Sequence, residues 1–520
     1  MSHLSYRLPG GRTLLDDVSF RVGNGEHVAL VGANGVGKTT AIRLVAGEEP
    51  ARSGTVTVDG SLVVMHQFIG SIRDRRTVRD LLVALSPPAV RRAAERLAAA
   101  ERALAGHATD EHGLRYADAI AAWGDAGGYA AEVLWDTCTR AALRLRVVDA
   151  ADRPLRTLSG GEQKRLALEL LLRSDAAVLL LDEPDNYLDV PTKEWLEAQL
   201  RACSKTILFV SHDRELLARV ADKVVTLEAR GSWTHGGSFA TWHDAREARL
   251  ARLDEEHRRW REERRRLEDH VRELRVRLRT SDKFASRLRA TKTKIQRHDD
   301  AAPGERPKDE RIAIRLEGDR SGKRAVTVQS LAFPGLVDPF DTEVLFGERV
   351  GILGLNGTGK THFLSLLAGR EIPHDGAWSL GARVVSGHFA QTHDHPELLG
   401  RRVLDACTSA GLVRGAAMAA LRRYGLQDAA DQPFETLSGG QQARLQILVL
   451  ELAGANLLLL DEPTDNLDVA SAESLEDALA TFAGTVLAAT HDRWFTRAFD
   501  RFLVFRRDGR VVETLEPVWS

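Results

Sequence analysis

Short apolar runs that end at a polar residue mark both halves of the 520-residue chain. The runs "AAVLLL" before Asp182 and "LLLL" before Asp461 have the length of a core strand, far below the ~20 residues that span a bilayer. Other apolar strands precede glycine-rich segments that begin at Gly32 and Gly354, and a helical pattern follows each segment. This alternation of buried strands and helices predicts an α/β fold.

A different pattern occupies the middle of the chain. From about 242 to 278, apolar residues recur seven positions apart, which is the spacing of a coiled-coil helix. After residues 280–282, a narrower apolar stripe continues. The two stripes consist of Leu253, Trp260, Leu267 and Leu274, and then Phe284, Leu288 and Ile295. We therefore expect an antiparallel helical hairpin, which lies in a linker placed at 241–324.

The rest of the chain is duplicated. "VALVGANGVGKTT" reappears as "VGILGLNGTGKTH", and "LSGGEQKRLALELLL" reappears as "LSGGQQARLQILVLEL". "VLLLDEPDNYLD" likewise matches "LLLLDEPTDNLD", and "ILFVSHDREL" matches "VLAATHDRWF". Four motifs in the same order, twice, predict two copies of one domain, at 1–240 and 325–520.

The first copy is longer than the second. Lys38 and Ser159 are 121 positions apart, whereas Lys360 and Ser438 are 78 apart. The extra residues fall in an alanine-rich segment at about 86–130 that lacks β-branched runs. This composition predicts a helical pair, or arm, inserted into the first domain.

Each copy contains the pattern GxxxxGK[ST] between a strand and a helix, which is typical of a phosphate-binding loop. Glycines let backbone N–H groups surround the phosphates at the positive end of a helix. The lysine reaches the β- and γ-phosphates, and the threonine hydroxyl binds Mg²⁺. The predicted nucleotide-binding residues are Gly32, Asn34, Gly35, Gly37, Lys38, Thr39 and Thr40, and in the second copy Gly354, Asn356, Gly357, Gly359, Lys360 and Thr361.

Acidic and histidine side chains follow the apolar strands of both copies. Asp182 and Asp461 end such strands, where a carboxylate organises Mg²⁺. The next residues, the catalytic candidates Glu183 and Glu462, are placed to polarise a water for attack on the γ-phosphorus. The histidines of "SHD" and "THD" suit contact with the γ-phosphate, and they are His212 and His491.

The composition excludes several classes of protein. Three cysteines lie far apart and form no CxxC pair, so a disulfide framework, a zinc module and an iron–sulfur cluster are not expected. The start of the chain shows no export signal. We expect a cytoplasmic protein.

Charge is concentrated in one place. The net charge of the chain is −2, yet residues 272–298 carry ten Arg or Lys against two acidic residues. A solvated coiled-coil face has balanced charges, so this stretch predicts an anionic partner, of which a phosphate backbone is the commonest. Acidic protein is the alternative. The predicted RNA-binding residues are Arg275, Arg277, Arg279, Lys283, Arg287, Arg289, Lys292 and Lys294.

The four motifs in this order resemble the ATP-binding cassette (ABC) superfamily. The resemblance implies that two cassettes pack head to tail within one monomer, with ATP and Mg²⁺ between the glycine-rich loop of one and the LSGG of the other. The LSGG residues are Ser159, Gly160, Gly161, Ser438, Gly439 and Gly440. It also implies that Gln67 and Gln391 reach the metal and that Phe333 stacks on adenine, where the first copy has Leu8.

Two cassettes, an arm in the first and a charged helical linker resemble the ABC-F family in particular. This resemblance implies an ATPase that binds the ribosome near the E site, with the linker close to P-site tRNA and the peptidyl-transferase centre. Antibiotic resistance by ribosome protection is one role that it implies. A housekeeping translation role and an ATPase subunit of a drug exporter are the alternatives, and an exporter subunit has no need of a basic hairpin.

Overall fold

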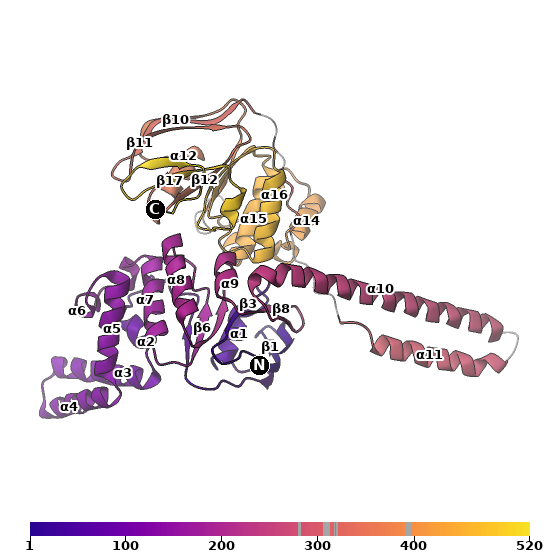
Figure 1. Cartoon of the computed structure of the whole chain (residues 1–520), viewed down its shortest axis with the longest axis horizontal. Helices are drawn as coiled ribbons and strands as arrows, with labels where there is room; N and C mark the ends of the chain where they lie inside the picture. The colour runs from indigo at the N-terminus through magenta and orange to yellow at the C-terminus, as the bar shows by residue number, and fades with distance from the viewer. Residues whose placement is uncertain (279–281, 305–311, 317, 319–320, 391–397, 520) are drawn as a thin grey trace.

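The computed structural model describes residues 1–278, 282–304, 312–316, 318, 321–390 and 398–519. Two α/β units are stacked on each other, and two helical projections leave the first unit in opposite directions (Figure 1). One projection contains α3 (Pro88–Gly106) and α4 (Asp110–Asp125), and the other contains α10 (Phe239–Leu278) and α11 (Ala285–Asp300). This architecture confirms the predicted fold class, with its inserted arm and its hairpin linker.

The first cassette contains a six-stranded sheet in which all neighbouring strands run parallel except the pair β8 and β9. In spatial order the strands are β5 (Leu62–Met65), β6 (Val178–Asp182), β7 (Thr206–Val210), β3 (His27–Val31), β8 (Lys223–Leu227) and β9 (Ser232–His235). Alternate residues of β6 and β7 enter different core clusters, because both faces of the sheet are covered. Burial on both faces explains the continuous apolar runs.

A smaller antiparallel sheet and several helices complete this cassette. The small sheet has the order β2 (Thr13–Val18), β1 (Ser2–Arg7) and β4 (Ser53–Thr55). The other helices of this cassette, apart from those of the arm, include α1 (Lys38–Val45), α2 (Val78–Ala84), α7 (Gly160–Arg173), α8 (Val190–Ala202) and α9 (Arg214–Val220). Each copy of LSGG begins its helix with a capping box, in which Ser159 of α7 accepts from Glu162 N at 3.2 Å.

The arm is an antiparallel pair of helices, α3 (Pro88–Gly106) and α4 (Asp110–Asp125). It returns to the cassette through α5 (Gly128–Leu143) and the short α6 (Val147–Ala150). Trp123 and Trp135 meet at the base with ring centroids 5.9 Å apart, and Trp135 donates to Ser86 Oγ at 3.1 Å. These aromatic contacts join the arm to the core of the cassette.

The second cassette repeats the first. Its six strands are β14 (Ser386–Phe389), β15 (Leu457–Asp461), β16 (Thr485–Ala489), β12 (Arg349–Gly354), β17 (Arg501–Phe505) and β18 (Val511–Thr514). Its small sheet has the order β11 (Val337–Leu345), β10 (Arg324–Phe333) and β13 (Asp375–Leu380). Its helices are α12 (Lys360–Leu367), α13 (Val403–Ser409), α14 (Arg414–Arg423), α15 (Gly439–Leu452) and α16 (Val469–Thr481).

The linker forms a hairpin of α10 (Phe239–Leu278) and α11 (Ala285–Asp300), with a 3₁₀ turn at Asp282–Phe284 between them. Leu267 and Leu274 of the predicted stripe are buried, and so is Val271 between them. The hairpin extends away from both cassettes (Figure 1). The heptad spacing therefore marks the seam between the two helices.

Candidate functional site

Both glycine-rich loops wrap around a lysine. Lys38 Nζ donates to the carbonyl oxygens of Gly32 and Ala33 at 2.8 and 3.1 Å, and Lys360 Nζ makes the matching bonds in its own loop at 2.8 and 2.9 Å. Both side chains are buried at the first turn of a helix. A cation is thus held where a helix N-terminus already favours negative charge.

The glycine before each lysine cannot be replaced. Gly37 and Gly359 have φ of 107° and 100°, in the left-handed region. A Cβ at Gly37 would lie 2.8 Å from Leu15 Cδ2, and one at Gly359 would lie 2.9 Å from Val337 Cγ2. Glycine therefore lets the loop pack against the small sheet while it turns its N–H groups inward.

The donor set near the first loop fits Mg²⁺. Asp182 ends β6, is 1% exposed, and its Oδ1 has no hydrogen-bond partner among the described residues. Burial raises the pKa of Asp182, and a hydrogen bond from Thr39 lowers it. Among the described residues no group of three or more His, Cys, Asp or Glu could hold a metal by itself. The ion would therefore need nucleotide oxygens besides Asp182 and Thr39, as a nucleotide-bound magnesium does. Asp461 ends β15 in the same position.

Glu183 lies at the centre of the first site. Its φ of 49° is unusual for a residue other than glycine, and its N–H donates to Val210 O at 2.9 Å. Gln67 Nε2 and Asn186 Nδ2 donate to its Oε2 at 2.7 and 2.5 Å. Burial and the adjacent Asp182 raise the pKa of Glu183. The strained backbone and the two amide donors fix the direction of this carboxylate.

Glu462 repeats this geometry, also with φ of 49°. His491 N donates to Glu462 Oε2 at 2.9 Å, and the ring Nε2 lies 3.6 Å from Oε1. Burial, with the neighbouring Asp465 carboxylate, raises the pKa of Glu462 to about 8. The pKa of this carboxyl group thus lies near neutral pH, where a general base works best.

His212 and His491, here called the switch histidines, have lowered pKa values and are neutral near pH 7. Burial, with the nearby Lys38 charge, lowers the pKa of His212 to about 3. His212 Nε2 lies 3.9 Å from Glu183 Oε1. Burial and Lys360 likewise lower the pKa of His491, whose Nε2 is 3.0 Å from Asn356 Oδ1. A neutral imidazole in this place can donate or accept one hydrogen bond at a phosphate oxygen.

The two cassettes meet with the glycine-rich loop of one against the segment that follows the candidate catalytic glutamate of the other. Asn34 N donates to Asp468 Oδ2 at 2.9 Å, and Asn34 Nδ2 donates to Asn466 O at 2.7 Å. Asn356 Nδ2 donates to Tyr187 O at 3.4 Å. One cavity of about 650 Å³ lies between the cassettes, and its lining includes Lys38, Thr39, Gln67, Ser159, Gly160, Gly161, Glu183, His212, Ser438, Gly439, Gly440, Glu462 and His491. The structure therefore brings most of the predicted site residues together.

The predicted residues that do not line this cavity include Gly32, Asp182, Gly354, Gly357, Gly359, Lys360, Thr361, Asp461 and Phe333. Phe333, at the end of β10, is 2% exposed and lies in the apolar core of the second cassette, so its stacking on adenine stays a prediction. Leu8, at the corresponding place of the first copy, lines the interface cavity. Gln391 and Arg279 lie outside the described residues.

Lys164 is a site residue that the sequence did not single out. It is fully buried on α7, and its Nζ donates to the carbonyl oxygen of Glu183 at 2.6 Å. Burial lowers the pKa of Lys164 to about 8. The second copy has Ala443 at the matching position, so comparing the copies residue by residue would have marked it.

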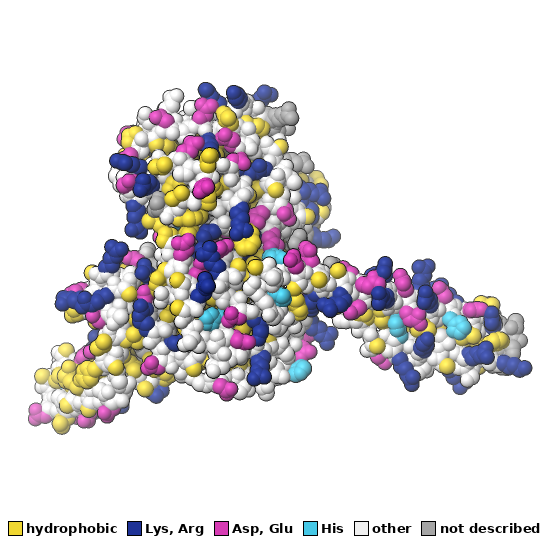
Figure 2. Space-filling view, viewed as in Figure 1, with side chains coloured by type: hydrophobic (Ala, Val, Ile, Leu, Met, Phe, Trp, Pro, Cys, Tyr) yellow, Lys and Arg dark blue, Asp and Glu magenta, His cyan; other side chains and the backbone are white. Residues whose placement is uncertain are grey.

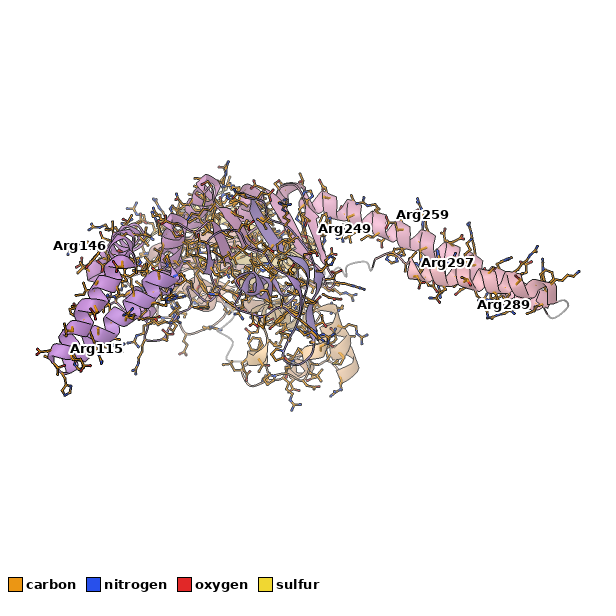
Figure 3. All side chains as sticks on the ribbon, turned by 90° about the horizontal axis from the view of Figure 1, so that it is seen from below. Arg115, Arg146, Arg249, Arg259, Arg289 and Arg297 are labelled. Atoms are coloured by element: carbon orange, nitrogen blue, oxygen red, sulfur yellow. The ribbon has the colours of Figure 1, made fainter. Side chains whose placement is uncertain are left out.

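The basic residues of the hairpin are exposed on its outer half. Those of the predicted set that make no ion pair with a described acidic residue are Arg275, Arg287, Arg289 and Lys292. Lysine and arginine side chains follow the lower edge of the hairpin to its free end (Figure 2). Figure 3 places Arg289 near that end and Arg297 nearer the cassettes on the same helix. Near the cassettes, in contrast, arginines pair with neighbouring acids, as Arg259 does with Glu255 at 2.8 Å.

Known proteins share this organisation. The ABC transporter family model matches residues 15–186 and 337–465. An antibiotic resistance protein of Mycobacteroides abscessus is 52% identical over 100% of both chains. ABC transporter F family member 2 of Arabidopsis thaliana is 30% identical over 97% of this chain and 76% of its own. The energy-dependent translational throttle protein EttA of Mycobacterium tuberculosis is 30% identical over 94% of this chain and 87% of its own.

A solved structure confirms the fold. The archaeal ribosome recycling factor aABCE1, crystallised with the ribosomal stalk protein aP1, has a TM-score of 0.58 and 20% identity over 96% of this chain and 87% of that chain. Among the residues described, no helix has the length and apolar character needed to cross a membrane.

The duplicated fold, the paired loops and the acidic and histidine motifs define a tandem ATP-binding cassette protein. The relatives extend over nearly all of the chain and include named F-family members. The chain belongs to the ABC transporter family, in its ABC-F group.

Proposed function

We propose that this protein hydrolyses ATP at two composite sites and binds the ribosome when its cassettes are closed on ATP. In that state the basic hairpin would lie near P-site tRNA and the peptidyl-transferase centre and alter translation. The observation that supports this most directly is a set of exposed cations on the outer half of the hairpin, Arg275, Arg287, Arg289 and Lys292, which make no ion pair with a described acidic residue. Self-repulsion there requires an anionic partner, and RNA supplies phosphates densely.

Each residue of the sites has a role in the proposed hydrolysis. Lys38 and Lys360 would bind the β- and γ-phosphates, and the LSGG segment of the opposite cassette would close over the nucleotide. Thr39 with Asp182, and Thr361 with Asp461, would hold Mg²⁺, which neutralises phosphate charge when bound. Gln67 and Gln391 would reach the same ion.

Glu183 and Glu462 would accept a proton from the attacking water, and His212 and His491 would contact the γ-phosphate. The short Gln67–Glu183 bond supports the first role, because it holds the carboxylate in one orientation. Loss of the γ-phosphate would remove a shared contact of both cassettes, so hydrolysis would favour opening and release.

Ribosome binding is tested by co-sedimentation with ATP. The double variant Glu183→Gln, Glu462→Gln, called the trap, should slow hydrolysis and keep the cassettes closed. A second protein, the outer-half variant, carries the trap mutations together with Arg275→Glu, Arg287→Glu, Arg289→Glu and Lys292→Glu. The matched control carries Glu at Arg252, Arg258, Arg259 and Arg261, which are exposed on α10 and lie nearer the cassettes than the outer-half set. We expect the trap and the control to pellet with ribosomes and the outer-half variant to remain in the supernatant.

The opposite result rejects the proposal. If the trap stays in the supernatant at low salt, where phosphate contacts are strongest, the ribosome is not the partner. The ATPase subunit of a drug exporter then becomes the function to test, by capture of membrane subunits.

Antibiotic resistance is a narrower part of the proposal. It is supported by the 52% identity to a protein named for resistance. Purified protein added to cell-free translation should restore synthesis that is inhibited by antibiotics of the peptidyl-transferase region. Unchanged inhibition across a panel of such drugs, with ribosome binding intact, would instead favour a housekeeping translation role.

A further inference from the structure

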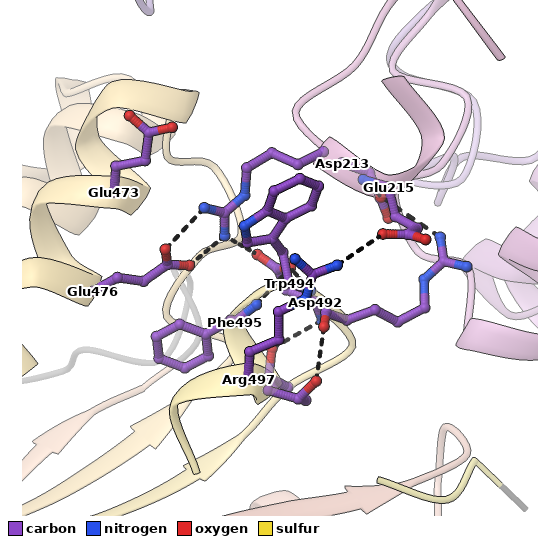
Figure 4. Close-up of polar contacts among 12 residues, drawn as sticks. Asp213, Glu215, Glu473, Glu476, Asp492, Trp494, Phe495 and Arg497 are labelled. Carbon is purple, nitrogen blue, oxygen red and sulfur yellow. Dashed lines mark hydrogen bonds and ion pairs between the residues drawn. The ribbon is translucent and has the colours of Figure 1, made fainter. Parts of the chain in front are cut away.

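Each switch histidine is followed two positions later by an arginine that crosses to the other cassette. In the first cassette this residue is Arg214, at the start of α9. Its Nη1 donates to Glu476 Oε2 at 2.9 Å and its Nη2 donates to Asp492 Oδ2 at 3.1 Å. Both acceptors, Glu476 and Asp492, belong to the second cassette and are labelled in Figure 4. The arginine is therefore bound to acids that are 262 and 278 positions away in sequence.

The second cassette makes the matching contact to the first. Arg493 forms an ion pair with Glu197 and lies 3.6 Å from Asp213 Oδ1, both in the first cassette. Glu197 stands eight residues after the N-cap of α8, Asp189, as Glu476 stands eight after the N-cap of α16. The arrangement is thus reciprocal, and it follows the duplication of the chain.

The aspartates that the arginines reach fix the switch loops. Asp492 Oδ1 accepts from the backbone of Trp494 and Phe495 at 2.8 and 3.1 Å. Asp213 Oδ1 accepts from the backbone of Glu215 and Leu216, both at 3.0 Å. Each aspartate directly follows its switch histidine. A displacement of the aspartate therefore also moves the backbone that carries the imidazole.

The contacts are shielded from water. Arg214 is 2% exposed, and its guanidinium lies 5.5 Å from the centre of the Trp494 ring, which comes from the opposite cassette. Charge-assisted bonds from a buried guanidinium are strong and directional. They also need both cassettes in place, because neither arginine finds these acids in its own cassette.

We propose that Arg214 and Arg493 are positioning residues that act in trans, each holding the switch-histidine loop of the opposite cassette. His491 is then aligned only while the first cassette is docked, and His212 only while the second is. Closure at one nucleotide would organise the catalytic geometry at both sites. This inference rests on the proposed ATP hydrolysis for its consequence, but the geometry can be tested without it.

The direct test is hydrogen exchange of backbone amides in the full chain. Arg214→Ala should raise exchange at residues 494–495 of the second cassette, and Arg493→Ala should raise it at 215–216 of the first. The control is Arg173→Ala, because Arg173 pairs with the buried Glu169 on α7, within the first cassette. Arg214→Lys keeps the positive charge but loses the planar, two-pronged set of N–H donors, so it should raise amide exchange by an intermediate amount. Exchange that rises only in the mutated cassette, or equally in the control, overturns the proposal.

The kinetic test uses one active site at a time. In a Glu462→Gln background only the first site hydrolyses, and Arg493→Ala should lower kcat about tenfold with less than a twofold change in KM for ATP. In a Glu183→Gln background Arg214→Ala should do the same for the second site. Equal kcat with and without the arginines overturns the inference. Absence of hydrolysis in the unmodified protein would instead reject the ATPase proposal, and the exchange measurement would still decide on the arginines.

Discussion

At the scale of single residues, the carboxyl group of Glu462 determines how the second site responds to pH. Burial and the Asp465 carboxylate raise its pKa to about 8. Below this pH the group is mostly protonated and cannot accept a proton, and above it the group is ionised. In a Glu183→Gln background, kcat/KM for ATP should therefore rise about tenfold from pH 7 to 9, because kcat/KM reports the free enzyme.

The control for this profile is Glu183→Gln with Glu462→Gln, which should show no rising limb. A flat kcat/KM between pH 6.5 and 9 in the Glu183→Gln protein would contradict the role of Glu462 as a base. The switch histidines cannot produce the limb, since the pKa of His212 is about 3 and that of His491 is also lowered.

The first cassette departs from the second at a buried ion pair. Its motif has Asp185 where the second copy has Thr464, and its α8 has Lys193 where α16 has Ala472. Lys193 Nζ lies 3.0 Å from Asp213 Oδ2, and burial together with Asp213 raises the pKa of Asp185 to about 6. The two substitutions compensate each other, because the lysine charge offsets the added carboxylate.

Removing Lys193 alone should be costly. Lys193→Ala leaves the buried Asp185 beside Asp213, and we expect a loss of about 3 kcal/mol in unfolding free energy. Adding Asp185→Thr should recover part of the loss, which thermal unfolding would show as a partial return of Tm. The deficit of the single variant should shrink as the pH falls, since protonation of Asp185, whose pKa Lys193 no longer lowers, removes the repulsion. A double variant less stable than the single one would contradict the pairing.

At the scale of elements, Trp260 and His298 join the two helices of the hairpin. Their rings stack with centroids 5.5 Å apart and an interplanar angle of 8°. Trp260 Nε1 donates to His298 O at 3.0 Å, and His298 Nε2 lies 2.9 Å from Trp260 O. Trp260→Ala should therefore raise amide exchange throughout α11 while kcat for ATP stays within about twofold.

Arg261→Ala is the matched control for this element, because Arg261 Nε donates to the carbonyl of His257 on its own helix. Exchange in α11 should not change in that variant. If Trp260→Ala also leaves α11 protected, the apolar seam at Leu267, Val271 and Leu274 holds the hairpin without the aromatic contact.

Elements whose signal is local could be predicted from the sequence. The strands before Asp182 and Asp461, the capped helices at Ser159 and Ser438, and the heptad seam all depend on residues close to one another in the chain. The acidic partners of Arg214 could not be predicted in this way, because they lie more than 260 positions away and only docking of the cassettes brings them near. The burial of Phe333 could not be predicted either. Its position in the sequence does not reveal that its ring packs in the core of the second cassette.

At the scale of the whole molecule, α16 connects the nucleotide site to the linker. Asp468 at its N-terminus accepts from Asn34 of the first glycine-rich loop. Two glutamates further along the helix contact other parts of the molecule. Glu473 Oε1 lies 3.2 Å from His243 Nε2 of α10, and Glu476 accepts from Arg214. Val469 enters the apolar core of the first cassette. A movement of α16 on opening would thus act on the loop, the switch region and the root of the hairpin together.

The salt dependence of ribosome binding then measures what the far end of the hairpin contacts. Each phosphate neutralised by a Lys or Arg adds about 0.7 to 0.9 to the slope of log K against log salt. Alanine at Arg275, Arg287, Arg289 and Lys292 in the Glu183→Gln, Glu462→Gln protein should therefore lower that slope by roughly 3. Alanine at Arg252, Arg258, Arg259 and Arg261, which lie nearer the cassettes, should change it by less than about 1. If affinity falls equally at every salt concentration with an unchanged slope, the outer cations shape the hairpin and do not contact phosphate.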